Sequence, residues 1–128
     1  MLLIAKCIRS ERLPSLIEYA KACGLEPFVE VVDEPELDRA LEGGARLIGV
    51  NARDLDTLQM DAERAARVLA RIPSGRIAVH LSGVKSNADA RKIAASRADA
   101  ALIGEALMRR DDPGPLLAEL VAGASSLT

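Results

Sequence analysis

The sequence predicts an α/β fold built on a parallel sheet, because five apolar segments that favour strands are each followed by a segment with helical spacing. Most of the five are continuous apolar runs without alternation, which is typical of strands whose two faces are covered by helices. Their starts recur every 19 to 30 residues, room for one strand and one helix each. The predicted strands are Leu2–Ile8, Pro27–Val32, Arg46–Val50, Arg76–Leu81 and Ala100–Ile103.

The first predicted helix follows the strand at the start of the chain. Leu13, Leu16, Ile17 and Ala20 have the i, i+3, i+4, i+7 spacing of a buried helix face. Gly24 stands where the glycine that ends a helix is common. We therefore expect a helix between the first and second strands.

The later helices are predicted from their start signals. Asp33 followed by Glu36 forms a plausible capping pair before the second helix. Asp61 and Ser86 are capping residues before the third and fourth helices, and Asp112-Pro113 has the composition of a helix start before the last. These signals complete five βα units.

Two architectures accept five such units: an open doubly wound sheet of the flavodoxin type, or part of an eight-stranded βα barrel. We expect one domain over residues 1–122 and a frayed tail over 123–128. In both architectures ligands bind where the strands end. The residues at those ends are Glu30, Asn51, Arg53, Leu81, Ser82, Gly83, Gly104 and Glu105.

The composition excludes several classes of function. The 128 residues carry a formal net charge of −2, and positive and negative side chains are well mixed, so the chain offers no basic surface to a nucleic-acid backbone. Tyr19 and Phe28 are the only aromatic residues, so there is no surface on which bases could stack. No apolar run approaches the roughly 18 residues of a membrane span, and no secretory signal is recognisable, so we expect a cytoplasmic protein. Cys7 and Cys23 lie in apolar patterns, and we expect both in the core.

The stretch VHLSGVKS, residues 79–86, predicts a phosphate site. An apolar strand ends there in Ser82-Gly83, and Ser86 then starts a helix. Free backbone N–H groups in such a turn can hold an anion, although an ordinary strand-to-helix turn would read the same way.

Four motifs carry a resemblance to a known family. The segments PFVEV, ARLIGVNARDLDTL, LSG and ALIGEALMR, in this order and spacing, closely resemble indole-3-glycerol phosphate synthase, a (βα)8 barrel of tryptophan biosynthesis. The resemblance implies a partial TIM barrel, with the five predicted strands as strands four to eight and the first three absent. The chain would then be a truncated form of a carboxy-lyase that closes, decarboxylates and dehydrates carboxyphenylamino-deoxyribulose phosphate.

The resemblance also implies roles for residues at the strand ends. Glu30 matches a catalytic glutamate suited to proton transfer, and Asn51 matches an amide that positions the substrate. Arg53 matches an active-site arginine that could pair with a carboxylate or with Glu30. The pairs Ser82-Gly83 and Gly104-Glu105 match the two phosphate loops. No cofactor and no metal ion is implied.

Three departures from the family bear on activity. The family usually has Glu-Ser-Gly where this chain has Leu81-Ser82-Gly83, so an active-site carboxylate is replaced by an apolar side chain. The family's essential lysines and one further glutamate belong to strands one to three, and Lys6 matches none of them. Arg97 stands where the family favours glycine. We therefore expect the chain alone to be inactive.

The expected partial barrel leaves strand edges and apolar interior uncovered. We expect either a homo-oligomer or a partner that supplies an N-terminal half. Two other functions stay open: a non-catalytic half-barrel scaffold that at most binds phosphate, and another phosphate-binding barrel enzyme. His80, next to Leu81, should point to the opposite face of its strand.

Overall fold

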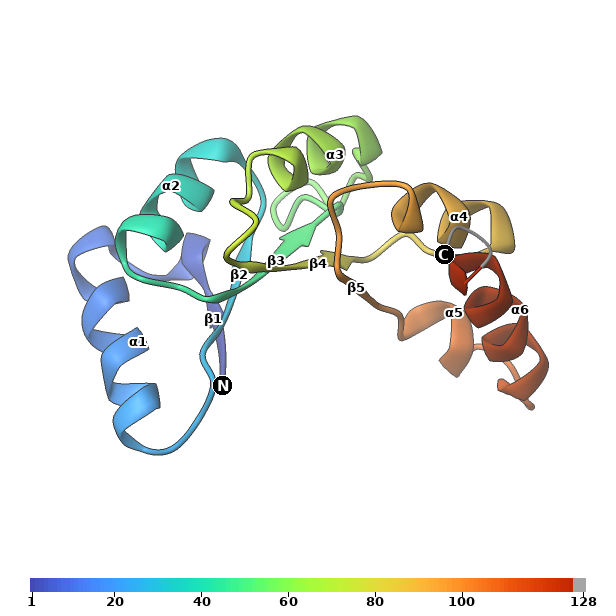
Figure 1. The fold of residues 1–128 in the computed structure, drawn as a ribbon, viewed down its shortest axis with the longest axis horizontal. Coiled ribbons are helices and arrows are strands. Elements are labelled where there is room, and N and C mark those ends of the chain that lie inside the picture. The colour runs from blue at the N-terminus through green and yellow to red at the C-terminus, as the bar shows by residue number, and fades with distance from the viewer. Residues whose placement is uncertain (126–128) are drawn as a thin grey trace.

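A computed structural model of the chain, which describes residues 1–125, contains a single sheet of five parallel strands. The strands lie side by side in sequence order, so each connection is a crossover through a helical segment (Figure 1). This is the arrangement of an arc of a βα barrel, and it excludes the flavodoxin-type order. The strands are β1 (Leu2–Ile4), β2 (Phe28–Val31), β3 (Leu47–Asn51), β4 (Ile77–Leu81) and β5 (Ala100–Leu102).

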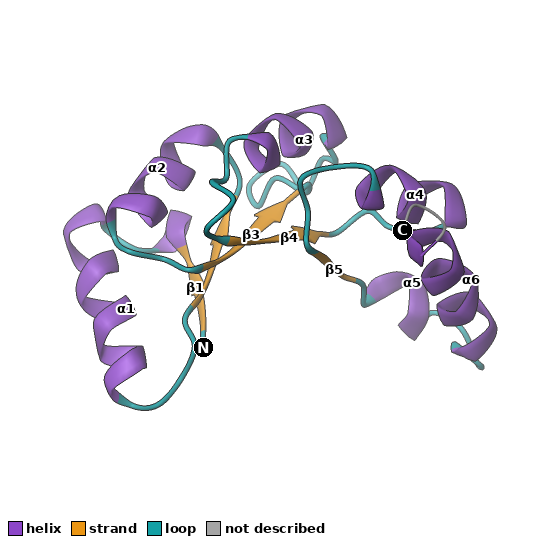
Figure 2. Ribbon diagram, in the orientation of Figure 1, coloured by secondary structure: helices purple, strands orange, loops and turns teal. Residues whose placement is uncertain are grey.

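The helices follow the strands along the outside of the arc (Figure 2). Two short 3-10 turns, Ala5–Cys7 and Ser10–Arg12, precede the first of them. The α-helices are α1 (Leu13–Ala22), α2 (Glu34–Glu42), α3 (Ala62–Ala70), α4 (Asn87–Ala94), α5 (Glu105–Met108) and α6 (Gly114–Ser125). The prediction that helices cover both faces of the sheet is wrong, because consecutive right-handed crossovers place every helix on one face.

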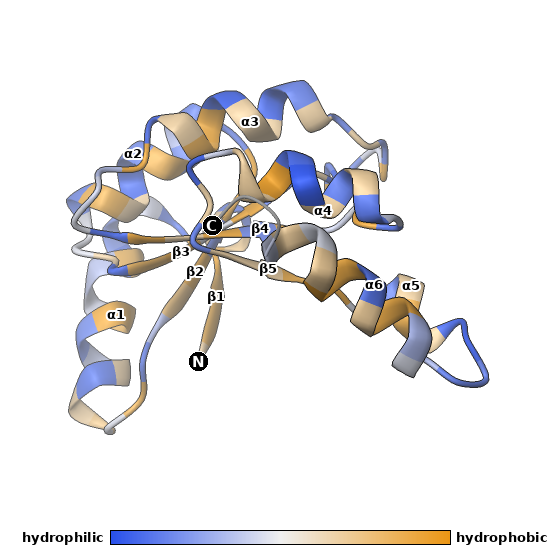
Figure 3. Ribbon diagram, turned by 45° about the vertical axis from the view of Figure 1, so that its right-hand side comes forward, coloured by the Kyte–Doolittle hydropathy of each residue, from blue (hydrophilic) through white to orange (hydrophobic). Residues whose placement is uncertain are grey.

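The strand register separates the two faces of the sheet. The row Leu3, Val29, Ile48 and Ala78 faces the helices, and all four side chains are buried. The neighbouring row Leu2, Phe28, Leu47 and Ile77 faces the inside of the arc, and none of these is buried. The sheet therefore has a packed outer face and an open inner face (Figure 3).

Two separate apolar clusters form the core. The larger one joins the outer face of β1–β4 to α1, α2 and α3, with Leu13, Ile17 and Leu37 fully buried at its centre. The smaller one lies around Val84 and Leu120 and joins α4 to α6. The C-terminal helices thus pack mainly on α4.

The start signals expected from the sequence are confirmed. Asp33 Oδ1 accepts the N–H of Glu36 at 2.9 Å, and the Asp61 side chain caps α3 in the same way. Ser86 and Asp89 form a reciprocal capping box at α4. The expected last helix begins one residue past Asp112-Pro113, and α5 was not predicted as a helix.

The first strand is shorter than predicted. It ends at Ile4, and residues 5–7 form a 3-10 turn in place of the extended segment expected to Ile8. Arg39 of α2 donates hydrogen bonds to the carbonyl groups of Ala5 and Ile8 and so holds this turn. A distant side chain therefore overrides the apolar pattern.

The prediction that both cysteines lie in the core is wrong. Cys7 is exposed because it lies in that turn, and Cys23 is exposed because it is the residue that ends α1. The tail expected over 123–128 begins inside α6, which continues to Ser125, and residues 126–128 lie outside the described part. Among the described helices, none has the length and apolar character that crossing a membrane requires.

Arg97 ties the lower ends of β4 and β5 to the end of α3. Its guanidinium donates hydrogen bonds to the carbonyl groups of Ile72, Pro73 and Arg76 at 3.2, 2.9 and 2.8 Å. It also pairs with the Asp99 carboxylate at 2.9 Å, and the same carboxylate accepts the N–H of Ala78. Arg97 thus satisfies three carbonyl groups.

Candidate functional site

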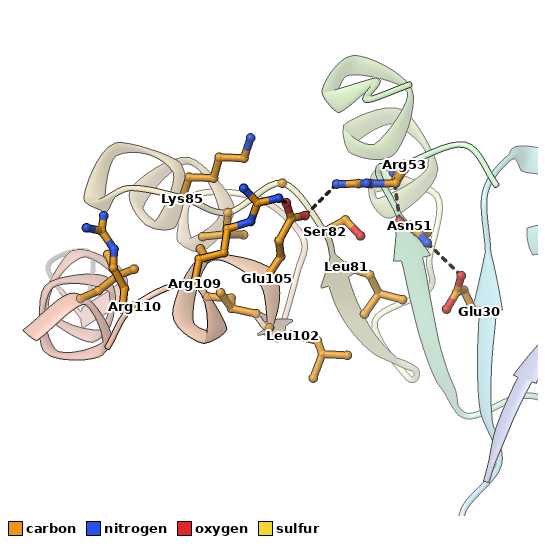
Figure 4. A pocket seen from close by; sticks show the side chains of 16 residues that line it. Glu30, Asn51, Arg53, Leu81, Ser82, Lys85, Leu102, Glu105, Arg109 and Arg110 are labelled. Carbon is orange, nitrogen blue, oxygen red and sulfur yellow. Dashed lines mark hydrogen bonds and ion pairs between the residues drawn. The ribbon is translucent and has the colours of Figure 1, made fainter. Parts of the chain in front are cut away.

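A cavity of about 660 Å³ lies where β2, β3, β4 and β5 end. All eight residues singled out at the strand ends of the sequence line it, and Figure 4 shows six of them labelled. The parallel strands explain this convergence, because their carboxyl ends meet at one rim of the sheet. The predicted members are Glu30, Asn51, Arg53, Leu81, Ser82, Gly83, Gly104 and Glu105.

Glu30 and Asn51 form a buried hydrogen-bonded pair at this rim. Asn51 Nδ2 donates to Glu30 Oε1 at 2.9 Å, and Asn51 Oδ1 accepts the backbone N–H of Arg53 at 2.9 Å. Both residues of the pair are more than nine-tenths buried. The amide is therefore held in one orientation, and the second carboxylate oxygen of Glu30 stays available to a ligand.

Arg53 pairs with Glu105 and not with Glu30. Arg53 Nη2 lies 2.9 Å from Glu105 Oε2, and the other oxygen of this carboxylate lies 3.1 Å from Arg109 Nη2 (Figure 4). Glu105 thus bridges two arginines across the mouth of the cavity. An anion that binds here competes with Glu105 for both guanidinium groups.

The Ser82-Gly83 turn has a strained backbone. Ser82 has φ +69°, a left-handed conformation that residues other than glycine rarely adopt, and Gly83 follows with φ +81°. His80 is buried and points to the helix side of β4, as expected from its position next to Leu81. Its Nε2 donates a hydrogen bond to the Ser82 carbonyl at 3.0 Å. Burial lowers the pKa of His80, so its ring is neutral near pH 7.

The helix start after this turn is already occupied by a carboxylate of the chain. Asp89 Oδ2 accepts hydrogen bonds from the N–H groups of Lys85 and Ser86, each at 3.1 Å. Burial raises the pKa of Asp89, but the hydrogen bonds from Ser86 and Lys85 outweigh it and hold that pKa below its usual value. Within the described residues, the N–H groups of Gly83 and Val84 donate to no partner, so they are the donors left for an anion.

Leu81 fills the wall of the cavity next to the Glu30–Asn51 pair. It is buried, and its register partner on β3 is Asn51. Gly49 below it has no room for a side chain, since an added Cβ would come within 2.8 Å of Leu81 and 2.7 Å of Phe28. The apolar side chain is therefore packed into the sheet and makes no hydrogen bond with the pair.

Three basic side chains of the cavity were not predicted. Lys85, Arg109 and Arg110 line its outer half, toward α5 and α6 (Figure 4). The doublet after IGEALM was visible in the sequence, but nothing there indicated that both arginines would line this cavity. With Arg53 they make four cations against the two acids Glu30 and Glu105, in a chain whose net charge is −2.

Lys6 pairs with Asp56 in the loop after β3. The hydrogen bond to Asp56 raises the pKa of the Lys6 ammonium, so it stays charged. Lys6 does not line the cavity. Among the described residues, no three side chains of the His, Cys, Asp or Glu type converge to hold a metal ion. The cavity can therefore offer an anion cationic side chains and free N–H groups, next to one buried carboxylate.

Comparison with known proteins identifies the family. Residues 1–120 match the family described as indole-3-glycerol phosphate synthase. The chain is 46% identical over 121 residues to indole-3-glycerol phosphate synthase 2 of Streptomyces coelicolor, covering 94% of this chain and 47% of the relative. It is also 46% identical over 125 residues to indole-3-glycerol phosphate synthase of Mycolicibacterium vanbaalenii, covering 97% and 46%. The chain thus spans about half the length of these curated relatives.

Solved structures with low sequence identity share the fold. The 3-hexulose-6-phosphate synthase of Salmonella typhimurium matches with a TM-score of 0.77 at 16% identity, covering 96% of this chain and 60% of that one. The thiamine phosphate pyrophosphorylase of Pyrococcus furiosus gives 0.77 at 16%, covering 98% and 59%. The five-stranded arc is therefore an established βα barrel substructure. Its sequence match over residues 1–120 shows that the chain belongs to the indole-3-glycerol phosphate synthase family.

Proposed function

We propose that this chain provides the Glu30–Asn51 pair and the phosphate side of an indole-3-glycerol phosphate synthase site. The observation that carries the proposal is one cavity lined by Glu30, Asn51, Arg53 and both glycine turns, contributed by four strand ends. The reaction of the whole protein would close the five-membered ring of carboxyphenylamino-deoxyribulose phosphate and release carbon dioxide and water.

Each residue has a chemical task that fits its surroundings. Glu30 can accept or return a proton, or stabilise a cation formed on ring closure, because one carboxylate oxygen is free of Asn51. Arg53 can bind the substrate carboxylate when its ion pair with Glu105 breaks. The N–H groups of Gly83 and Val84, with Lys85, can hold the phosphate.

Leu81 is the residue that sets the limit of this activity. A carboxylate at this position would lie beside Asn51, on the same face of the sheet as Glu30. An apolar side chain there can neither give nor take a proton. We infer that Leu81 leaves ligand binding intact and reduces turnover.

The buried Leu81 also favours a second function, a phosphate-binding module without catalysis. Binding at the two glycine turns needs no group from Leu81. The two functions differ in whether Glu30 takes part in chemistry. They can be separated with the same set of variants.

Binding is tested first, by titrating the chain with inorganic phosphate and following the amide NMR signals of Gly83 and Gly104. Both signals should shift together. Glu105→Gln should tighten binding about three- to tenfold, because it removes a negative charge next to the anion. Arg110→Gln should weaken binding by a similar factor. Signals that do not move would contradict both functions.

Turnover is tested next on the chain combined with an N-terminal half from a relative, which supplies strands one to three, by adding the aryl-amino sugar phosphate and following the absorption of indoleglycerol phosphate. Leu81→Glu should raise the rate of indoleglycerol phosphate formation, and a Glu30→Gln exchange in that background should remove the gain. Glu30→Gln should leave phosphate affinity unchanged. If both Leu81 forms bind phosphate and neither forms indoleglycerol phosphate in the presence of the N-terminal half, the binding module is the better description.

A further inference from the structure

The sheet has two edges that no other described strand covers. β1 pairs only with β2, and β5 pairs only with β4. Each edge strand is three residues long, and both run in the same direction. Unpaired N–H and C=O groups on such edges are a template for another strand.

The inner face between these edges is apolar and exposed. Leu2, Ile77 and Leu102 point inward, and 54%, 38% and 60% of their surfaces are accessible. The next inner row contains one charged residue, Glu30, which lies at the rim with the cavity. The inner row below that rim, Leu2, Phe28, Leu47 and Ile77, is apolar, so a partner that packs on it would remove no charged side chain from water.

The total surface is larger than a free-standing chain of this size should have. The accessible area is 7444 Å² for a mass of 13.6 kDa. Folded monomers of that mass expose about 6,600 Å², so roughly 900 Å² is in excess. A standard stable interface buries about 800 Å² on each partner. The excess is therefore what one specific partner would cover.

We propose that two copies of this chain associate around a two-fold axis that runs along the strands, with β5 of each copy beside β1 of the other. A parallel sheet continues as a parallel sheet across the dimer only if the β5 edge of one copy pairs with the β1 edge of the other. The two edge strands match in length, since each has three residues. Pairing two β1 edges about a two-fold axis would be antiparallel and would leave both β5 edges open.

This arrangement closes the sheet into a ring and turns both inner faces toward each other. Leu2 and Leu102 leave water, and the carboxyl ends of all strands point the same way. Both cavities then open at one end of the dimer. Such a dimer goes beyond the proposed function and does not depend on it.

The oligomeric state tests the proposal. Sedimentation equilibrium at chain concentrations on the order of 10 µM should give the mass of a dimer. Leu102→Glu should weaken association about a hundredfold, because it places a charge in the apolar interface. Tyr19→Glu, at a residue that is 67% exposed on α1, makes the same change outside the interface and should have no effect.

Several results would overturn it. A monomer at that concentration, a larger assembly, or Leu102→Glu associating as well as the parent would each do so. Because Leu102 is exposed in the single chain, its variant should fold, and far-ultraviolet circular dichroism checks this.

Cross-linking tests which edges meet. With Cys7 and Cys23 replaced by serine, chains carrying Leu2→Cys or Ala100→Cys are oxidised separately and as a mixture. The edges proposed to pair predict a disulfide between unlike chains only. Disulfides formed within either separate sample would show like edges in contact and contradict the arrangement.

Discussion

Replacing Arg97 with alanine should destabilise the fold far more than the loss of an ordinary surface charge. The guanidinium satisfies the carbonyl groups of Ile72, Pro73 and Arg76, and it pairs with Asp99. Alanine leaves these four groups to water, at a place where only 23% of the arginine side chain is exposed. The lower ends of β4 and β5 lose their tie to α3.

The expected loss can be worked from these contacts. Three hydrogen bonds, at the ordinary net value of about 0.5 to 1.5 kcal/mol each for a partly exposed site, give about 1.5 to 4.5 kcal/mol. The ion pair adds little because half of the Asp99 side chain is exposed. With an unfolding entropy of about 2.1 cal/mol/K per residue over 128 residues, the melting temperature should fall by about 6 to 17 °C.

Urea unfolding followed by circular dichroism measures the effect, with Arg71→Ala as the matched control. Arg71 pairs with Asp38 at 2.9 Å, and both side chains are about half exposed, so its loss should cost less than about 1 kcal/mol. Arg97→Lys should be intermediate, since a single ammonium cannot reach all three carbonyl groups. Unfolding of Arg97→Ala and Arg71→Ala at the same urea concentration would refute the role given to Arg97.

Two further predictions concern pH. Burial lowers the pKa of His80 in the folded chain, so the unfolded chain takes up the proton first as the pH falls. The contribution of neutral His80 to the free energy of unfolding should be complete above about pH 6.5 and decrease below it. His80→Gln should flatten that part of the dependence of urea stability on pH. The pKa of Asp89 is lowered in the folded chain, so its contribution to the free energy of unfolding should be present above about pH 4 and lost as the pH falls further. Asp89→Asn should lower the free energy of unfolding by about 0.5 to 2 kcal/mol at pH 7 and remove that acid dependence. An unchanged dependence on pH would argue against the capping box.

The parts of the fold that depend on local chemistry could be predicted from the sequence. Asp33, Asp61 and Ser86 cap helices because a side-chain oxygen and an N–H a few residues later meet in any chain context. The end of β1 could not be predicted, because it is decided by Arg39, which lies 34 residues beyond Ala5. The exposure of Cys7 follows from the same contact.

Some features of the site could likewise be predicted from the sequence, and others depend on contacts between distant segments. Glu30 and Asn51 could be expected at one rim, since Asn51 is the last residue of one apolar parallel strand and Glu30 lies next to the last residue of its neighbour. Their roles came from a family resemblance and remain predictions. The partner of Arg53 could not be read from the sequence, because Glu105 reaches it from an element 52 residues away.

The two apolar clusters have a consequence for how the chain opens. Residues around Val84 and Leu120 share no core with the sheet-and-helix cluster that contains Leu13 and Leu37. Amide hydrogen exchange should therefore show the C-terminal third detaching at a lower free energy than global unfolding. The cavity has one wall in each unit, so an anion that binds both Arg53 and Arg109 in place of Glu105 would hold the two units together and slow that detachment.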